Sequence, residues 1–199
     1  VKTDYLISEC TFGLPIFKWD QTKNIAINIS NWINNSPDKT SLLFCYSLGK
    51  AQRLLNEISK TNFEGNIYTH ASIHKMNDCY RQLGICIKDT IKIENKKKID
   101  QLKGNLILLP PSLSKGSYLK NFKNIQTAFA SGWMSIRALR NRSGYDKGFA
   151  ISDHADWEGI LEVVKKSEAK NVFFHHGDSE ALSKYLSEKE SINVLLFEK

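Results

Sequence analysis

Two short stretches place polar, chemically active side chains directly after runs of strand-forming residues. In "FAISDHADW" the apolar run leads into Asp153, His154 and Asp156, and in "NVFFHHGD" another leads into His176 and Asp178. Imidazole transfers protons near neutral pH and binds metals in its neutral form, while a nearby carboxylate fixes its tautomer. These residue types predict an acid–base or metal site, provided that the fold brings the two stretches together.

Strand-like and helix-like segments alternate along the whole chain. The predicted strands are "DYLIS", "SLLFCYS", "NIYTH", "NLILLPP", "IQTAFAS", "GFAIS", "NVFFH" and "INVLLFE". Such alternation predicts an α/β fold with mainly parallel sheets flanked by helices. Parallel strands end on one edge of a sheet, where ligands bind. We therefore expect "GFAIS" and "NVFFH" to share that edge, and Glu9 to reach it if "DYLIS" joins the same sheet.

Ordinary structural roles could also explain the polar residues at these strand ends. Asp156 and Asp178 are placed to cap the helices that follow them, and the histidines would then have no chemical role. The recurrence of a histidine followed by an acid at both strand ends favours a shared site. His70 and His74 also have ligand-like spacing, but a strand end and an exposed helix face are the favoured interpretation for them.

Composition limits the classes of protein that the chain can represent. The chain has 199 residues and is 41% hydrophobic, which suits a globular protein with a buried core. Its apolar runs are far shorter than the roughly 20 residues of a membrane span, and no apolar signal segment is visible, so we expect no membrane association. The four cysteines lack framework spacing, which favours free thiols and a cytosolic location.

The charge distribution favours a nucleic-acid partner. The formal net charge is +7, and basic residues cluster in "IENKKKIDQLK" and "SIRALRNRSGYDK". Arg137, Arg140 and Arg142 lie just ahead of His154 and suit phosphate contacts, because guanidinium groups bind phosphates with paired hydrogen bonds. The alternative is that both clusters are only solvated loops.

The ordered set of motifs resembles a known enzyme family. "LISECTFG", "YSLGKAQRLL", "LLPPS", "AFASGWM", "FAISDHADW" and "FFHHGD" resemble the β-CASP branch of the metallo-β-lactamase superfamily. Within it, they are most similar to bacterial ligase-associated DNA exonucleases, often described as mRNA 3′-end processing factors. The resemblance covers nearly the whole chain. It implies a β-CASP domain at 17–131, and 1–16 with 132–199 as part of a metallo-β-lactamase αββα domain.

The resemblance also implies roles for particular residues. Glu9 matches an acid that supports the family's second histidine, and His154 matches that histidine, which acts beside the scissile phosphate as an acid or a stabiliser. Asp156 matches the orienting acid beside it, and His176 matches a ligand of one zinc. Two zinc ions are expected in the complete enzyme, with single-stranded DNA or RNA as the substrate. A functional association with an ATP-dependent DNA ligase is implied as well.

One departure from the family pattern limits what this chain can do. The family's early "HxHxDH" motif, a further histidine and a bridging aspartate supply most metal ligands, and none of them is present. The five histidines are His70, His74, His154, His175 and His176. We therefore expect a C-terminal portion of a zinc-dependent nuclease that is inactive by itself. The alternative is a non-catalytic nucleic-acid-binding module without a metal site.

Overall fold

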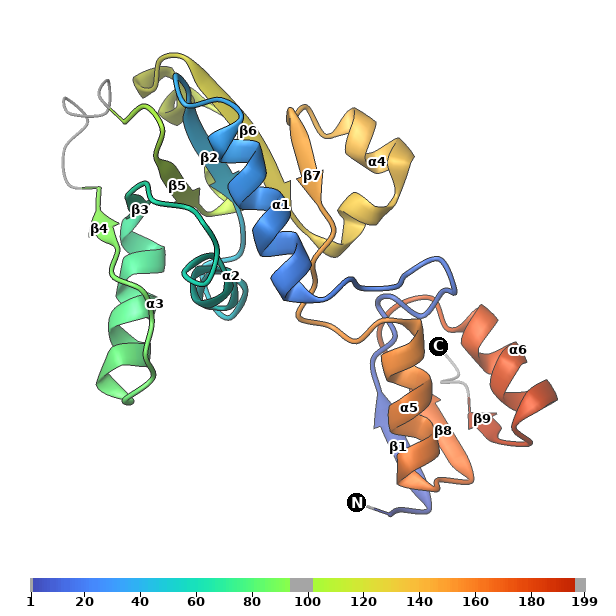
Figure 1. Ribbon diagram of the computed structural model, residues 1–199. Coiled ribbons are helices and arrows are strands. Elements are labelled where there is room, and N and C mark those ends of the chain that lie inside the picture. Colours follow the sequence, from blue (N-terminus) through green and yellow to red (C-terminus); the bar gives the residue numbers. More distant parts are fainter. Residues whose placement is uncertain (1, 94–101, 196–199) are drawn as a thin grey trace. The chain divides into compact units, whose positions relative to one another are not determined.

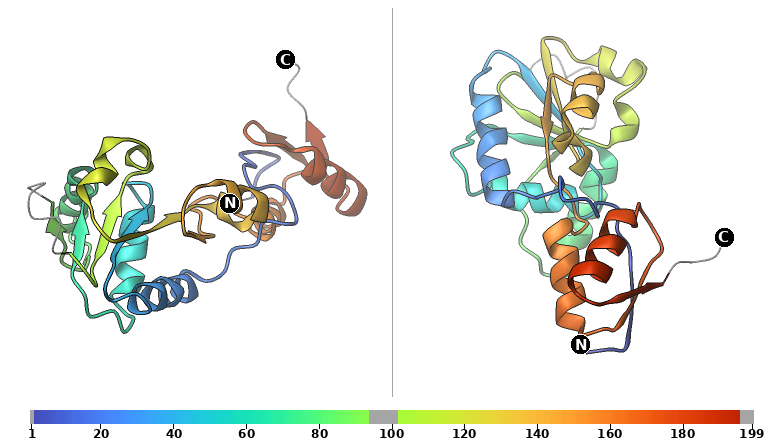
Figure 2. Two further views of the ribbon diagram at one scale, coloured as in Figure 1. Left: turned by 90° about the horizontal axis from the view of Figure 1, so that it is seen from above. Right: turned by 90° about the vertical axis from the view of Figure 1, so that its right-hand side faces the viewer.

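A computed structural model of the protein describes residues 2–93 and 102–195, which form two compact units (Figures 1 and 2). The terminal unit joins Val1–Trp19 to Asp153–Lys199, and the central unit comprises Asp20–Ser152. Both units contain parallel sheets flanked by helices, which confirms the predicted α/β class. Most of the lysine-rich stretch "IENKKKIDQLK" lies outside the described residues.

The central unit is built on a six-stranded parallel sheet with the strand order β4-β3-β5-β2-β6-β7. The strands are β2 (Thr40–Phe44), β3 (Ile67–Thr69), β4 (Ile91–Lys92), β5 (Leu106–Leu109), β6 (Ile125–Ala130) and β7 (Lys147–Phe149). The helices are α1 (Thr22–Asn34), α2 (Lys50–Ile58), α3 (Ala71–Gln82) and α4 (Arg137–Arg142), with the 3-10 turns η2 (Pro111–Leu113), η3 (Ser117–Asn121) and η4 (Gly132–Ser135).

The central strand β2 is apolar at successive positions because both of its faces are buried. Leu43 packs with Ile29 of α1 and Leu55 of α2 in one buried cluster. Phe44 points to the other face and packs with Phe122, which follows η3. Successive side chains of a strand point to opposite faces, so a strand between two covering layers must be apolar throughout.

The terminal unit has a three-stranded parallel sheet with the strand order β1-β8-β9. Its strands are β1 (Tyr5–Ser8), β8 (Asn171–Phe174) and β9 (Asn193–Leu195), and its helices are α5 (Trp157–Ser167) and α6 (Glu180–Lys189). The register pairs Ser8 with Phe174, so the two ends of the chain build one sheet. The expectation that the Glu9 strand shares a sheet with "NVFFH" agrees with this pairing.

The two faces of this terminal sheet differ in how they are covered. Leu6 and Val172 pack against the apolar sides of α5 and α6. Tyr5 and Ile7 point to the opposite face, where their exposed fractions are 65% and 67%. The neighbour of Ile7 in register is Phe173, so this open face is largely apolar in its middle.

The structure corrects the predicted boundary between the two parts. Residues 132–152 were expected in the same part as β8, but they belong to the central unit. β7, from the predicted "GFAIS" strand, pairs in parallel with β6, and Phe149 packs against Trp32 of α1 with 5.9 Å between ring centroids. "GFAIS" and "NVFFH" therefore end on different sheets. The arginine-rich connection, for which a solvated loop was the alternative interpretation, forms η4 and α4.

The helices and the cysteines bear on the expectations about membranes and thiols. Within residues 2–93 and 102–195, no helix has the length and apolar content to cross a membrane. All four cysteines are free thiols, with Cys10 and Cys45 buried and Cys79 and Cys86 exposed.

Candidate functional site

The paired ends of β1 and β8 form the framework of the candidate site. Beyond the last strand pair, the backbone N–H of His175 donates to the carbonyl of Ser8 (3.1 Å), and that of Cys10 donates to the carbonyl of His176 (2.6 Å). These hydrogen bonds continue the parallel pairing past both strands. They hold the backbone at Glu9 beside the backbone at the two histidines.

Glu9 sits in a turn that stabilises its negative charge. One carboxylate oxygen, Oε2, accepts hydrogen bonds from the backbone N–H of Thr11 (2.8 Å) and from its hydroxyl (2.5 Å). Partial burial opposes ionisation, but these two hydrogen bonds and the nearby His154 lower the pKa of Glu9 below its usual value. Glu9 is therefore an ionised hydrogen-bond acceptor at neutral pH.

The other oxygen of Glu9 binds the imidazole of His154. The distance from Glu9 Oε1 to His154 Nδ1 is 3.2 Å. An ionised carboxylate only accepts hydrogen bonds, so Nδ1 must carry the proton, and Nε2 is the nitrogen that can exchange a proton with a substrate. The His154 side chain is 49% exposed, so solvent screens the charge of this pair and water or substrate can reach the ring.

Aromatic residues near the N-terminus fix the position of His154. The indole N–H of Trp19 donates to the backbone carbonyl of His154 at 2.9 Å. The ring of Phe12 meets the imidazole edge-on, with 5.9 Å between centroids. Phe12 also packs against Trp19, so the two contacts belong to one aromatic cluster. His154 thus reaches Glu9 from the segment before α5, and not from the end of a strand in the same sheet.

Both carboxylate oxygens of Asp156 are engaged with the backbone. Oδ1 accepts from the N–H of Gly159 (2.9 Å) and caps α5, and Oδ2 accepts from the N–H of Trp19 (2.8 Å). The predicted helix-capping role is confirmed. Asp156 holds Trp19, and Trp19 in turn donates to the carbonyl of His154, so Asp156 acts on the position of His154 indirectly. Its predicted part in catalysis stays a prediction. The other predicted cap, Asp178, accepts from the N–H of Glu180 (3.1 Å), the first residue of α6, although Ser179 is the residue at the N-cap position.

His175 and His176 lie together at the exposed end of β8. Their ring centroids are 6.5 Å apart, and both side chains are exposed. Gly177 follows with a φ of +99°, and a Cβ there would collide with the backbone carbonyl of Cys10 and come within 2.7 Å of the amide nitrogen of Thr11. Only glycine allows the "HHG" turn to pass this close to the turn that carries Glu9.

The described residues do not supply the ligands that a hydrolytic zinc requires. Such a zinc takes about three protein ligands and keeps one position open. Across residues 2–93 and 102–195, no three His, Cys, Asp or Glu side chains come close enough to hold a metal. These residues do not make up a zinc site by themselves. The assignment of His176 as a zinc ligand stays a prediction.

The predicted phosphate-binding arginines belong to the central unit. Arg137, Arg140 and Arg142 lie on α4 and are exposed. In the described part of the chain their guanidinium groups make no ion pair. They therefore form a basic surface that is available to an anionic partner.

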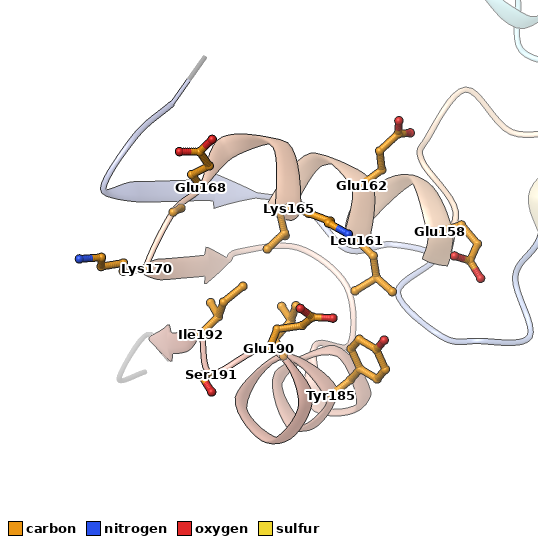
Figure 3. A pocket seen from close by; sticks show the side chains of 13 residues that line it. Glu158, Leu161, Glu162, Lys165, Glu168, Lys170, Tyr185, Glu190, Ser191 and Ile192 are labelled. Carbon is orange, nitrogen blue, oxygen red and sulfur yellow. The ribbon is translucent and has the colours of Figure 1, made fainter.

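A cavity of about 540 Å³ lies elsewhere in the terminal unit, between α5 and α6 (Figure 3). It is lined by apolar side chains such as Leu161 and Ile192 and by charged side chains, among them Glu158, Glu162 and Lys165. Glu162 pairs with Lys166 of the same helix. None of the predicted site residues lines this cavity, so it has no evident part in the chemistry of Glu9 and His154.

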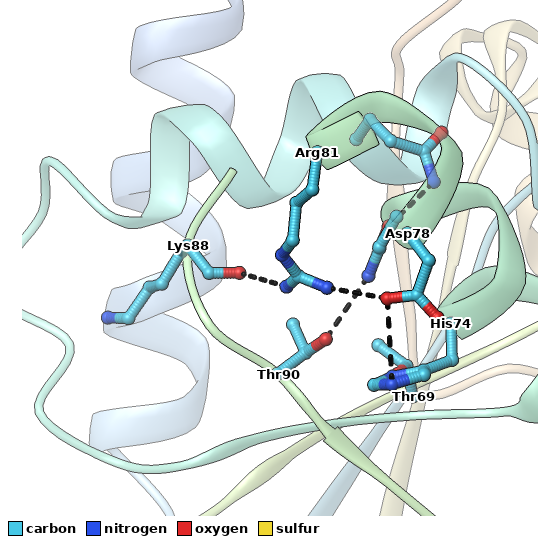
Figure 4. A network of polar contacts seen from close by, with 8 residues as sticks. Thr69, His74, Asp78, Arg81, Lys88 and Thr90 are labelled. Carbon is cyan, nitrogen blue, oxygen red and sulfur yellow. Dashed lines mark hydrogen bonds and ion pairs between the residues drawn. The ribbon is translucent and has the colours of Figure 1, made fainter. Parts of the chain in front are cut away.

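His70 and His74 have structural partners in the central unit. Nδ1 of His70 accepts from the backbone N–H of Ser72 (3.2 Å) and caps α3. Nδ1 of His74 lies 3.1 Å from the hydroxyl of Thr69, and its Nε2 lies 3.9 Å from Asp78, in a polar network that continues through Arg81 (Figure 4). This geometry agrees with the structural interpretation of both histidines.

Sequence reasoning missed three residues that shape the site, namely Thr11, Phe12 and Trp19. A threonine two positions after a glutamate can bond back to it, so "ECT" carried a usable local signal for Thr11. The contacts of Phe12 and Trp19 with His154 span more than a hundred residues of sequence. No local pattern indicates such contacts.

Comparisons with known proteins bear on the class of protein. Residues 148–196 match the family model of the RMMBL domain, described as the Zn-dependent metallo-hydrolase RNA specificity domain. The chain is also 26% identical over 188 residues to a protein of Opitutus terrae named "Probable DNA ligase". This match covers 94% of the chain and 18% of that protein, so the chain spans less than a fifth of its relative.

The parallel α/β fold, the ordered motifs and these two matches point to the same class of protein. The match to the RMMBL model covers the C-terminal part of the chain, and it agrees with the resemblance to the β-CASP branch of the metallo-β-lactamase fold. The description of this model associates residues 148–196 with metallo-hydrolases that act on nucleic acid.

Proposed function

We propose that the protein contributes to a zinc-dependent nuclease that hydrolyses phosphodiester bonds of single-stranded nucleic acid. The observation that carries this proposal is the Glu9–His154 pair, 3.2 Å apart, at the strand end that also bears His176. A histidine whose tautomer is fixed by a carboxylate can donate a proton to a leaving oxygen or stabilise charge on a phosphate. In this proposal Glu9 orients His154, and Asp156 positions it indirectly through Trp19.

The proposal assigns the two units different parts. The central unit is the β-CASP domain, which grips the strand. The terminal unit is part of the metallo-β-lactamase domain, and its open sheet face supports this assignment. Parallel sheets are normally covered on both faces, and exposed Tyr5 and Ile7 would be buried by a further sheet layer. That layer would carry the remaining zinc ligands.

DNA is the proposed substrate, and exonuclease action coupled to DNA repair or ligation is the proposed context. The relative named "Probable DNA ligase" supports an association with a DNA ligase, which we propose to be ATP-dependent. The free thiols support a cytosolic location. A second candidate is RNA 3′-end processing, which the description of the matching family model favours. Competition between DNA and RNA strands of one sequence distinguishes the two substrates.

Metal analysis with a nuclease assay tests the catalytic assignments. The 199-residue chain alone is expected to bind zinc weakly and to leave nucleic acid intact. Supplying a polypeptide with the "HxHxDH" motif, in cis or in trans, is expected to restore zinc binding and cleavage. In that complete enzyme His154→Ala should lower turnover about 100-fold or more and keep the zinc, because general acid–base groups contribute about that much. His176→Ala should lower both, and His175→Ala is the matched control.

Two outcomes would contradict these assignments. Metal-dependent cleavage by the 199-residue chain alone would show that its own residues complete a site. Full turnover in the His154→Ala variant would remove that histidine from the chemistry. A complete protein that binds nucleic acid and never cleaves it would favour the alternative, a non-catalytic binding module.

Salt titration of binding tests the arginine surface. Each phosphate contact that is lost should reduce the slope of log affinity against log salt by about 0.7 for a single strand. Replacing Arg137, Arg140 and Arg142 with alanine should therefore weaken binding and flatten the slope. An unchanged slope would exclude these arginines from the binding surface.

A further inference from the structure

A groove in the central unit, between α1 and β7, takes no part in the chemistry proposed above. Its volume is about 540 Å³. One wall carries Asn28, Asn31 and Asn35, from α1 and the residue after it, together with Trp32. The other wall is β7 with Lys147. Three amides, one indole, one carboxylate and one ammonium group thus line the groove, together with apolar side chains such as Phe149.

The asparagines form a row of uncommitted amides. Their spacing of three and four residues puts them on one side of the helix. All three are exposed, and none makes a side-chain hydrogen bond within the described part of the chain. Asn24, one turn earlier, differs because its amide donates to Asp20 at 2.7 Å. The row offers paired donors and acceptors to whatever lies in the groove.

The opposite wall is the edge of a sheet. β7 ends the strand order and pairs only with β6 among the described strands. Phe149 points toward α1, where it meets Trp32. Gly148 points the other way, because a Cβ there would lie 2.9 Å from Met134 Sδ and 3.0 Å from Arg140 Cγ. The edge of β7 therefore runs between the amide row on one side and a basic side chain of α4 on the other.

We propose that this groove binds the bases of a single-stranded nucleic acid. Asparagine amides match the donor–acceptor pairs on base edges, most directly those of adenine. Lys147 and Arg140, on opposite faces of β7, would contact the phosphates on either side. The inference rests on the proposed function and adds to it a subsite that distinguishes bases from backbone.

Nucleic acid fits the groove better than an extended peptide. A peptide that adds to a sheet edge needs a strand long enough for several backbone hydrogen bonds, and β7 has three residues. The acid in the groove, Asp20, already accepts hydrogen bonds from Gln21 and Asn24, both at 2.7 Å. Within the groove lining the charge of Asp20 is balanced by that of Lys147, and Arg140 beside Gly148 adds a positive charge at the border.

Binding titrations with two probes of equal length test the inference. One probe is a fluorescent oligodeoxyadenylate, and the other is an abasic strand with the same phosphates. The 199-residue chain should bind the adenylate more tightly. Replacing Asn28, Asn31 and Asn35 together with alanine should weaken adenylate binding about tenfold, because three hydrogen-bonding groups are lost. Binding of the abasic strand and the salt slope should stay unchanged, because no charge is removed.

The substitutions are suited to this test because alanine favours helices more than asparagine does. Asn34→Ala, on the same helix but outside the groove lining, is the matched control and should bind like the parent chain. If the parent chain binds neither probe, nucleic-acid binding and the proposed function fail together. If it binds both probes equally, or if the triple variant keeps the adenylate preference, the groove inference is overturned and the proposed function stands. A groove that serves a peptide partner would give that last result.

Discussion

Gly177→Ala is the most informative single substitution at the candidate site. The backbone at this position has a φ of +99°, which costs a residue with a Cβ about 1–2 kcal/mol. The new methyl group would also collide with the Cys10 carbonyl group and lie 2.7 Å from the Thr11 nitrogen. Backbone atoms cannot rotate away, so overpacking should add about 2 kcal/mol. We expect the free energy of unfolding of the terminal unit to fall by about 3–4 kcal/mol.

Gly84→Ala separates the two contributions. Gly84 has a φ of +76°, and a Cβ there would meet nothing within 4 Å. It should therefore cost only the backbone contribution, about 1–2 kcal/mol, and in the central unit. Hydrogen exchange of peptides from each unit, combined with denaturant unfolding, measures both effects. Equal losses for the two variants would refute the claim that the "HHG" turn is packed against the Glu9 turn.

Three further predictions concern the surroundings of the site. The folded-state pKa of Glu9 is lowered, so its charge stabilises the fold above the unfolded-state pKa, and this contribution is lost as pH falls through the folded-state value. Thr11→Val should raise that pKa, so the acid-induced loss of stability should move to higher pH. NMR titration of the Glu9 carboxyl group measures the pKa, and an unchanged value would show that the hydroxyl hydrogen bond is unimportant. Asp156→Ala should cost about 2 kcal/mol, because a helix cap and a second backbone partner are lost, and a change below about 0.5 kcal/mol in urea unfolding would contradict this. Burial and nearby negative charges raise the pKa of Cys10 to about 11, whereas Cys79 is an exposed thiol. After alkylation at pH 8, mass spectrometry should therefore find Cys79 modified and Cys10 intact. Early modification of Cys10 would contradict its burial.

The sequence by itself determined the class of the fold and much of its local structure. Alternating apolar runs and amphipathic segments are enough to predict parallel sheets between helices, because side-chain periodicity follows backbone geometry. The cap of α5 at Asp156 was also predictable, since an aspartate before an apolar helix satisfies its first N–H groups. The motif order indicated a family resemblance, and the match of residues 148–196 to the RMMBL model agrees with it.

Only the tertiary structure decided how Glu9 and His154 meet. The prediction used a shared sheet edge, which was wrong, because "GFAIS" pairs with β6 in the central unit. The contact depends instead on Phe12 and Trp19, which hold the segment before α5 from far away in the sequence. Strand propensity is local, so it predicts only that a strand forms. Which neighbouring strand it pairs with depends on which apolar faces can be buried together. That choice is a property of the whole packed chain, and it placed β7 in one sheet and His154 beside the other.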